Sequence, residues 1–212
     1  MIKVESFVNE LLASKCYAII DDVLNSCIII DPASKECLQE IELIERLRLK
    51  LDYIIITHEH TDHCLGVNAL KRKYPDSKIV YSEACNKNIK KANRIFFQFY
   101  FDNFENFNDV LPPDITIKTS DDYIVWGTKK VGFVLTPGHS LGSMCISIDN
   151  FLFTGDTILQ FPPVFCGMGC SIEEWQKSVK YITTHFSQET MICPGHGDCF
   201  LLKNYDNNSY NI

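Results

Sequence analysis

Residues 53–63 read YIIITHEHTDH, an apolar run followed at once by a cluster of histidines. Its first four residues are apolar and mostly β-branched, which predicts a strand buried in a layered α/β arrangement. The strand is expected to end at Thr57, and three histidines and one aspartate follow within six residues. Clustered imidazoles and a carboxylate need polar partners when they are buried, and a metal ion is a partner that takes all of them. The stretch therefore predicts a metal site at the end of a buried strand.

Three further segments each place a polar side chain directly after a predicted strand. They are LTPGHS at 135–140, FTGDT at 153–157 and CPGHG at 193–197. Glycine and proline beside the polar residue let the backbone bring a short ligand close to an ion. One small ion cannot take all four side chains of the first loop in tetrahedral geometry, so we expect two neighbouring ions. The candidate metal ligands are His58, His60, Asp62, His63, His139, Asp156 and His196.

Strands and helices alternate outward from this metal-binding pattern. Apolar β-branched runs predict a strand pair within 17–31 and strands at 53–56, 78–81, 115–118, 122–126, 130–136, 143–149, 151–154 and 190–193. Helices are expected at 35–50, 64–73, 83–94 and 172–185, the last with Ser171 as its N-cap. Strands precede helices in each half, which predicts an α+β fold of the αββα sandwich type, with two mixed β-sheets packed face to face and helices on both outer sides. The sequence has no evident linker or repeat, so residues 1–212 are expected to form one domain.

The composition narrows the class of protein. Hydrophobic residues make up 46% of the chain and charged residues 22%, an ordinary globular balance, and no apolar stretch is long enough to span a bilayer. The net charge of −7 disfavours a nucleic-acid partner. The N-terminus lacks the features of a secretory signal and the ten cysteines are scattered singly, so we expect reduced thiols in a cytoplasmic protein. The expected partner is a small-molecule substrate, with no nucleic acid and no membrane, and a homodimer is left open.

The H-x-H-x-D-H motif at 58–63, with the histidines and the aspartate of the three later segments, resembles the metallo-β-lactamase superfamily over nearly the whole chain. The flanks TPGHSLGS at 136–143 and FTGDT most resemble the glyoxalase II-like hydrolases. The resemblance implies a metallo-β-lactamase fold with two Zn²⁺ per chain at one edge of the sandwich, iron or manganese being alternatives. It also implies that one ion is held by His58, His60 and His139, the other by Asp62, His63 and His196, and that Asp156 bridges them.

Relatives of the same fold offer alternatives to a dizinc hydrolase. His60 stands where flavodiiron proteins typically have a glutamate, which favours zinc over a redox diiron site. A persulfide dioxygenase would use a single iron held by two histidines and one aspartate from the same positions, so that activity stays open. A metal-binding protein without catalysis is disfavoured, because every expected ligand is present.

Hydrolysis by hydroxide is the chemistry that two such ions support. The sequence has no clear general acid beside the site, and a thiolate leaves without one more readily than an alkoxide or an amide. This favours a small thioester or an activated ester as substrate, in the manner of glyoxalase II. Asp62 is expected to orient the hydroxide in addition to binding metal, and is the candidate catalytic residue.

Several features lie outside the predicted metal site. A basic helix face at Lys87, Lys90, Lys91 and Arg94 is interpreted as solvated, with recognition of an anionic group as the alternative. The Phe-rich segment 96–107 is interpreted as core or dimer contact, with a lid over the substrate as the alternative. Structural roles are expected for Cys64, Cys166 and Cys170, and for His185 at the end of its helix.

Overall fold

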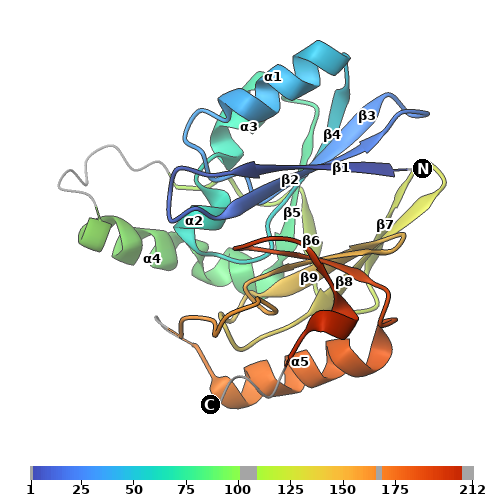
Figure 1. Cartoon of the computed structure of the whole chain (residues 1–212). Helices are drawn as coiled ribbons and strands as arrows, with labels where there is room; N and C mark the ends of the chain where they lie inside the picture. Colours follow the sequence, from blue (N-terminus) through green and yellow to red (C-terminus); the bar gives the residue numbers. More distant parts are fainter. Residues whose placement is uncertain (1, 101–108, 166–168, 207–212) are drawn as a thin grey trace.

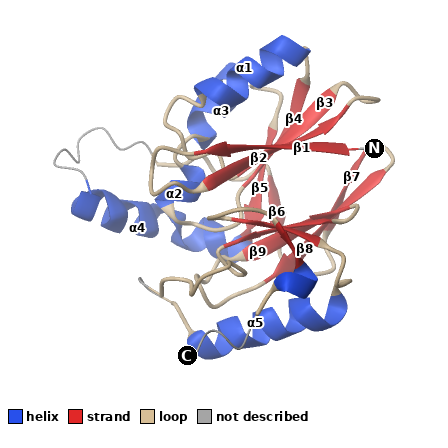
Figure 2. Cartoon of the chain, viewed as in Figure 1, coloured by secondary structure: helices blue, strands red, loops and turns tan. Residues whose placement is uncertain are grey.

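A computed structural model describes residues 2–100, 109–165 and 169–206, without the side chains of residues 95–100. Two six-stranded sheets pack face to face, and helices cover both outer sides (Figures 1 and 2). This confirms the predicted αββα sandwich. The Phe-rich segment and Cys166 fall on residues outside this description, so the predictions made for them stay predictions.

The first sheet belongs to the N-terminal half of the chain and is mixed. Its strands are β1 (Ile2–Val8), β2 (Lys15–Asp21), β3 (Ser26–Ile30), β4 (Lys50–Ile55), β5 (Lys78–Ser82) and β6 (Ile115–Ile117), and they lie in that order. The first three strands pair antiparallel, whereas β3 to β6 are parallel. The carboxyl ends of β3 and β4 therefore meet at one edge, which brings Asp31 beside the histidine-rich loop.

Helices connect the parallel strands of the first sheet. They are α1 (Leu38–Leu47), α2 (Thr61–Cys64), α3 (Val67–Lys73) and α4 (Glu83–Tyr100). In Figure 1, α1 and α3 cover the outer face of the sheet, and α4 lies beside the short α2 at the edge that carries the candidate ligands. Such crossovers are what parallel strands require.

The second sheet belongs to the C-terminal half. Its strands are β7 (Tyr123–Trp126), β8 (Lys129–Leu135), β9 (Met144–Ile148), β10 (Phe151–Gly155), β11 (Met191–Pro194) and β12 (Phe200–Leu201). All neighbours are antiparallel except β10 and β11, which are parallel and are joined through α5 (Ile172–His185) on the outer face. A 3₁₀ turn (Leu202–Asn204) follows β12. Ser171 caps α5 as predicted, because its Oγ accepts a hydrogen bond from the backbone N–H of Glu174 at 3.3 Å.

Three elements differ from the sequence-based expectation. The edge strand β1 and the two-residue β12 were not predicted. The helix expected over 64–73 is instead divided into α2 and α3. The division falls at Leu65 and Gly66, where the backbone N–H of Gly66 donates to the carbonyl of Pro32 at 2.9 Å instead of continuing the helix.

The core lies between the two sheets and holds the candidate site in place. Strands β2 and β3 are buried along almost their whole length. The ring of Tyr17 in β2 makes an edge-to-face contact with the ring of Phe153 in the second sheet, and the ring centroids are 5.2 Å apart. No disulfide joins two cysteines of the described residues. Within the same residues no helix combines the length and the apolarity needed to cross a membrane.

Candidate metal centre

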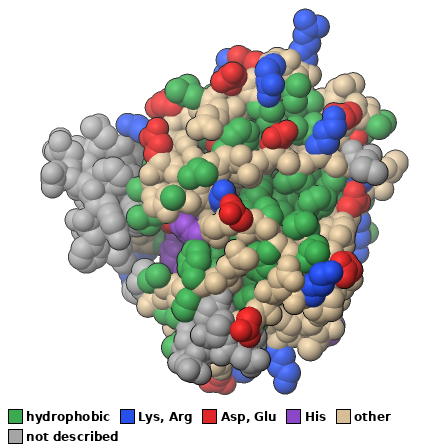
Figure 3. Space-filling view, viewed as in Figure 1, with side chains coloured by type: hydrophobic (Ala, Val, Ile, Leu, Met, Phe, Trp, Pro, Cys, Tyr) green, Lys and Arg blue, Asp and Glu red, His purple; other side chains and the backbone are tan. Residues whose placement is uncertain are grey.

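The structure brings all seven predicted ligands to one edge of the sandwich. The loop after β4 runs into α2 and carries four of them, while His139 lies between β8 and β9. Asp156 follows β10 and His196 follows β11. The ligands form three groups, and within each group the potential ligand atoms lie within 4.8 Å of one another. The groups are His58, His60 and His139; His58, His63 and Asp156; and Asp62, His63 and His196. Imidazole atoms reach the surface on this face, next to hydrophobic side chains (Figure 3).

Three imidazole nitrogens converge in the first group. The Nε2 of His58 lies 3.1 Å from the Nδ1 of His60, and the Nε2 of His139 lies 3.0 Å from the same atom. Two nitrogens bound to one tetrahedral zinc ion at about 2.05 Å would lie roughly 3.3 Å apart. The observed separations are therefore close to those of three ligands around one ion.

Asp156 lies between this group and a second one. In the second group, the Oδ2 of Asp62 lies 3.5 Å from the Nε2 of His63 and 3.4 Å from the Nε2 of His196. The Oδ2 of Asp156 is 3.4 Å from the Nε2 of His139 in the first group and 3.6 Å from the Nε2 of His196 in the second. One carboxylate thus contacts both groups.

Buried atoms without partners indicate that this cluster is built for a cation. The Nε2 of His63 and the Oδ1 of Asp156 are buried, and neither has a hydrogen-bond partner among the described residues. Leaving such atoms unpaired is costly, and a metal ion would satisfy both. The donor set of imidazoles and carboxylates suits zinc and other borderline divalent ions.

The electrostatics of the cluster also favour a positive charge. Burial and the neighbouring imidazoles hold the pKa values of His58 and His139 well below the ordinary value, and burial lowers that of His60 to about 4. These rings are uncharged at neutral pH and can offer lone pairs to a metal. Burial also disfavours the charged form of His63, but the surrounding carboxylates, led by Asp62 and Asp156, raise its pKa to about 10.

Asp31 fixes which nitrogen of two candidate ligands carries the proton. Its Oδ2 accepts from the Nδ1 of His63 at 3.0 Å and from the hydroxyl of Thr57 at 2.7 Å. Because that hydroxyl proton is committed to Asp31, the contact of 2.9 Å between Thr57 Oγ1 and His58 Nδ1 requires the His58 ring to donate. Both rings thereby turn Nε2 toward the centre, the usual arrangement of metal-binding histidines, and the Nε2 of His63 would give up its proton when a metal binds.

Glu59 joins the two ligand-bearing loops. Its side chain is buried, and its Oε2 accepts from the Ser140 hydroxyl at 2.9 Å and from the backbone N–H of Gly142 at 3.1 Å. Burial raises the pKa of this carboxyl group. Sequence reasoning missed Asp31, Thr57 and Glu59 as parts of the site; the position of Asp31 and Thr57 directly after two buried strands was the available signal.

Close backbone packing positions the ligands of the second sheet. Gly138 has φ 138°, and a Cβ there would lie 2.2 Å from the backbone nitrogen of Trp175 in α5. A Cβ on Gly195 would lie 2.2 Å from the Oδ1 of Asp156. Only glycine fits at these two places. The hydroxyl of Ser178 in α5 further supports the turn by donating to the carbonyl of Pro137 at 2.8 Å.

The remaining candidates belong to none of the three ligand groups. Cys64 is fully buried, and the thiol of Cys170 donates to the carbonyl of His139 at 2.9 Å. His185 is exposed and stacks on Tyr181 with ring centroids 4.1 Å apart, as expected for a residue outside the site. Lys87 of the basic face pairs with Glu83 at 2.8 Å, in keeping with a solvated helix face.

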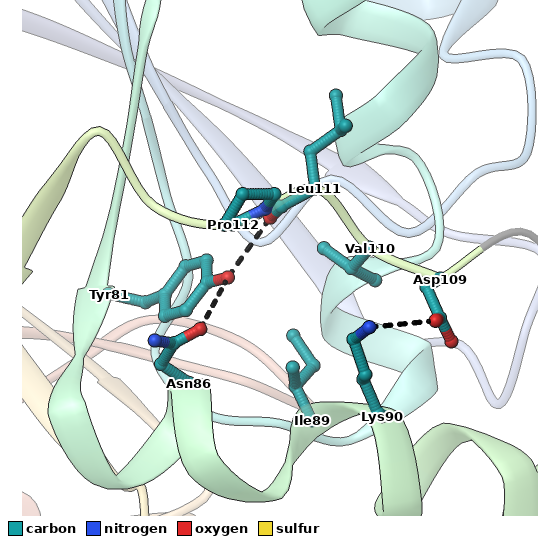
Figure 4. Close-up of a pocket in the computed structure, with 8 residues that line it drawn as sticks. All are labelled: Tyr81, Asn86, Ile89, Lys90, Asp109, Val110, Leu111 and Pro112. Carbon is teal, nitrogen blue, oxygen red and sulfur yellow. Dashed lines mark hydrogen bonds and ion pairs between the residues drawn. The ribbon is translucent and has the colours of Figure 1, made fainter.

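A separate cavity of about 230 Å³ lies between α4 and the chain at 109–112 (Figure 4). Lys90 and Asp109 form an ion pair of 3.0 Å at its side, and the hydroxyl of Tyr81 donates to the carbonyl of Leu111 at 3.0 Å. No candidate metal ligand lines this cavity. It is therefore distinct from the metal centre.

Comparisons with known proteins bear on the family and the fold of the chain. A family model described as "Metallo-beta-lactamase superfamily" matches residues 10–199. The chain is 29% identical over 185 residues to the "Probable polyketide biosynthesis zinc-dependent hydrolase PksB" of Bacillus subtilis, a match that covers 85% of this chain and 72% of that protein.

It is also 30% identical over 154 residues to a hydroxyacylglutathione hydrolase of Francisella philomiragia, covering 72% of this chain and 50% of that protein. The chain thus spans about half the length of this relative. Among solved structures, the BLEG-1 B3 metallo-beta-lactamase superposes with a TM-score of 0.78 at 20% identity and 95% coverage of both chains. That last likeness bears on the fold alone.

Proposed function

The chain belongs to the metallo-β-lactamase superfamily, and from this membership we propose that it is a dinuclear-zinc hydrolase of one domain, acting on a small thioester or ester. One observation carries the proposal. The carboxylate of Asp156 contacts His139 in one ligand group and His196 in the other, at 3.4 and 3.6 Å. A carboxylate in that position is suited to bridge two ions, with His58, His60 and His139 around one and Asp62, His63 and His196 around the other.

The residues of the chain prepare the site for this chemistry. Asp31 and Thr57 bond to the Nδ1 atoms of His63 and His58 and so direct the Nε2 atoms of both rings inward. Two bound zinc ions would lower the pKa of a water between them toward neutrality and polarise the carbonyl group of a substrate. Asp62, whose Oδ2 belongs to the second group, would accept a hydrogen bond from the attacking oxygen and so orient it.

The relatives support a hydrolase and zinc as the metal. The name of PksB describes a zinc-dependent hydrolase, and the Francisella relative is named for the hydrolysis of hydroxyacylglutathione. The absence of an evident general acid in the sequence favours a leaving group that departs as an anion, and a thiolate does so most readily. We therefore propose a small thioester as the first substrate class to test, in a cytoplasmic protein without nucleic-acid or membrane partners.

Elemental mass spectrometry on protein purified without added metal tests the proposal. We expect close to two zinc ions per chain, followed by turnover on a panel of small thioesters and esters. The variant His60→Ala should keep only about one ion per chain and lose most of its activity, whereas His185→Ala, which alters an exposed histidine outside the site, should keep both ions and full activity. About one iron per chain with oxygen uptake would instead identify a persulfide dioxygenase, and two metals without turnover on the panel would remove the hydrolase assignment.

A further inference from the structure

The candidate ligand His196 lies at the tip of a short hairpin whose base is formed by two cysteines. Strands β11 and β12 pair antiparallel, with Met191 opposite Leu201 and Ile192 opposite Phe200. Cys199 directly precedes β12, and one further step in the same register would set it opposite Cys193. The five residues between them form the loop, and His196 is its central residue.

This extended register would bring the two thiols within range of a disulfide bond. Directly opposed residues of an antiparallel pair have Cα atoms about 4.5–5.5 Å apart, and disulfides bridge Cα separations of about 4.4–6.8 Å. The Cys193 and Cys199 side chains are hydrogen-bonded to each other. Cys193 is buried, whereas Cys199 is exposed to solvent. The pair thus combines one accessible thiol with one protected thiol.

We propose that Cys193 and Cys199 are a redox-active thiol pair, which a hydroperoxide converts to an intramolecular disulfide at the base of the His196 hairpin. In the first step the Cys199 thiolate attacks the outer peroxide oxygen, so that the O–O bond breaks, Cys199 becomes a sulfenic acid and the other oxygen leaves as hydroxide or alkoxide. In the second step the sulfur of Cys193 attacks the Cys199 sulfur, and the sulfenic oxygen leaves as water after taking up the Cys193 proton. The two thiols lose two electrons to the peroxide, which is reduced to water or to water and an alcohol.

The surroundings of Cys199 suit it to the first step. A hydrogen bond from the Cys193 thiol and the positive charge of Lys15 lower the pKa of Cys199 below its ordinary value. The hydroxyl of Tyr17, which donates to the carbonyl of Pro194 at 2.7 Å, lies 3.8 Å from the Cys199 sulfur. An exposed thiol with thiolate character is the kind that oxidants attack first.

Oxidation would also act on the metal centre, a consequence that rests on the proposed function. Forming the bond brings the two sulfurs to about 2.05 Å, closer than any hydrogen-bonded contact between thiols. This tightens the base of the loop and shifts His196, whose neighbour Gly195 has no spare room beside Asp156. We expect the oxidised protein to retain less metal than the reduced protein.

Mass spectrometry of the metal-loaded, full-length protein tests the disulfide without relying on activity. The protein is treated with a small excess of hydrogen peroxide, unfolded, alkylated and digested with trypsin. The peptide Tyr181–Lys203 contains both cysteines and no other. We expect this peptide to carry two alkyl groups before oxidation and none afterwards. The oxidised peptide should then be lighter than the unalkylated dithiol peptide by two hydrogens, and reduction with dithiothreitol should restore the dithiol.

Two variants separate this outcome from others. Cys199→Ser should leave Cys193 alkylated after peroxide, whereas Cys145→Ser, at a buried cysteine of β9, should respond like the wild type. A wild-type peptide that stays reduced, or one in which Cys199 becomes a sulfinic acid without a disulfide, would overturn the proposal. Metal content is measured in parallel. If the disulfide forms and the metal content is unchanged, the thiol pair stands but its effect on the metal centre is contradicted. If the reduced protein holds no metal, that result counts against the proposed function instead.

Discussion

The two halves of the molecule contribute to the candidate centre in different ways. The N-terminal half supplies four candidate ligands from one loop after β4, all within residues 58–63. The C-terminal half supplies three, each from a different strand end: His139, Asp156 and His196. A contiguous loop fixes the spacing of its ligands locally, whereas the second set has its spacing fixed by the sheet.

The supporting contacts differ in the same way. In the N-terminal half, side chains set the protonation of the ligands, since Asp31 and Thr57 bond to the outer nitrogens of His63 and His58. In the C-terminal half, close backbone packing sets position, as at Gly138 against α5 and Gly195 against Asp156. We infer that the first half tunes the chemistry of the ligands and the second half sets the distance between the two metal positions.

Removal of the residue that touches both ligand groups should have the largest effect. We expect Asp156→Ala to lose both ions and to reduce kcat/KM by several orders of magnitude, because a bridging carboxylate serves both positions. Elemental mass spectrometry and steady-state kinetics on the same preparation measure the two effects. Retention of two tightly bound ions by this variant would show that Asp156 does not bridge.

A pair of histidine variants compares the two halves directly. His60→Ala removes a ligand of the first group only, and His196→Ala removes a ligand of the second group only. Each variant is therefore expected to retain about one ion per chain, with activity strongly reduced in both. Metal titration followed by elemental analysis gives the stoichiometry, and loss of both ions from either variant would mean that the two positions do not fill independently.

The role assigned to the N-terminal half is tested at Asp31. We expect Asp31→Asn to bind zinc about 10- to 100-fold more weakly, because an amide no longer holds the His63 proton on Nδ1 as a carboxylate does. Asp21→Asn is a matched control, since Asp21 is also a buried aspartate at a strand end but accepts bonds only from the turn at Val23 and Leu24. Competition with a chromophoric chelator measures the zinc affinities of both variants, and equal affinities would show that the contact of Asp31 with His63 does not support metal binding.

The difference between the two halves of the molecule also explains how much of the structure could be predicted from the sequence. The four ligands within residues 58–63 could be predicted because they lie close together in the sequence and follow an apolar run. The strand β1 was missed because it is an edge strand in which only Ile2 is buried, so its apolar pattern is weak. β12 has two residues, too few to show any period.

The supporting shell of the site could not be read from the sequence in the same way. Asp31 and His63 are 32 residues apart and meet only because β3 and β4 are parallel neighbours. Glu59 has the same local context as its neighbours in the motif, yet it points away from the metal cluster to Ser140. Such roles depend on the tertiary pairing of loops, which has no local signal.

The smallest effect is expected in the packing that positions the C-terminal ligands. Ser178→Ala removes the hydrogen bond from α5 to the carbonyl of Pro137, so we expect a loss of about 1 kcal/mol in the free energy of unfolding, or roughly 2–4 °C in Tm. Metal stoichiometry should be unchanged, because the glycine turn beside His139 still packs against Trp175. Thr184→Ala on the same helix is the control, since its exposed hydroxyl bonds, among the described residues, only to partners within α5, namely two carbonyls and the ring of His185. A calorimetric scan of the metal-loaded variants measures the difference, and an equal Tm for both would mean that this turn is held by its backbone contacts alone.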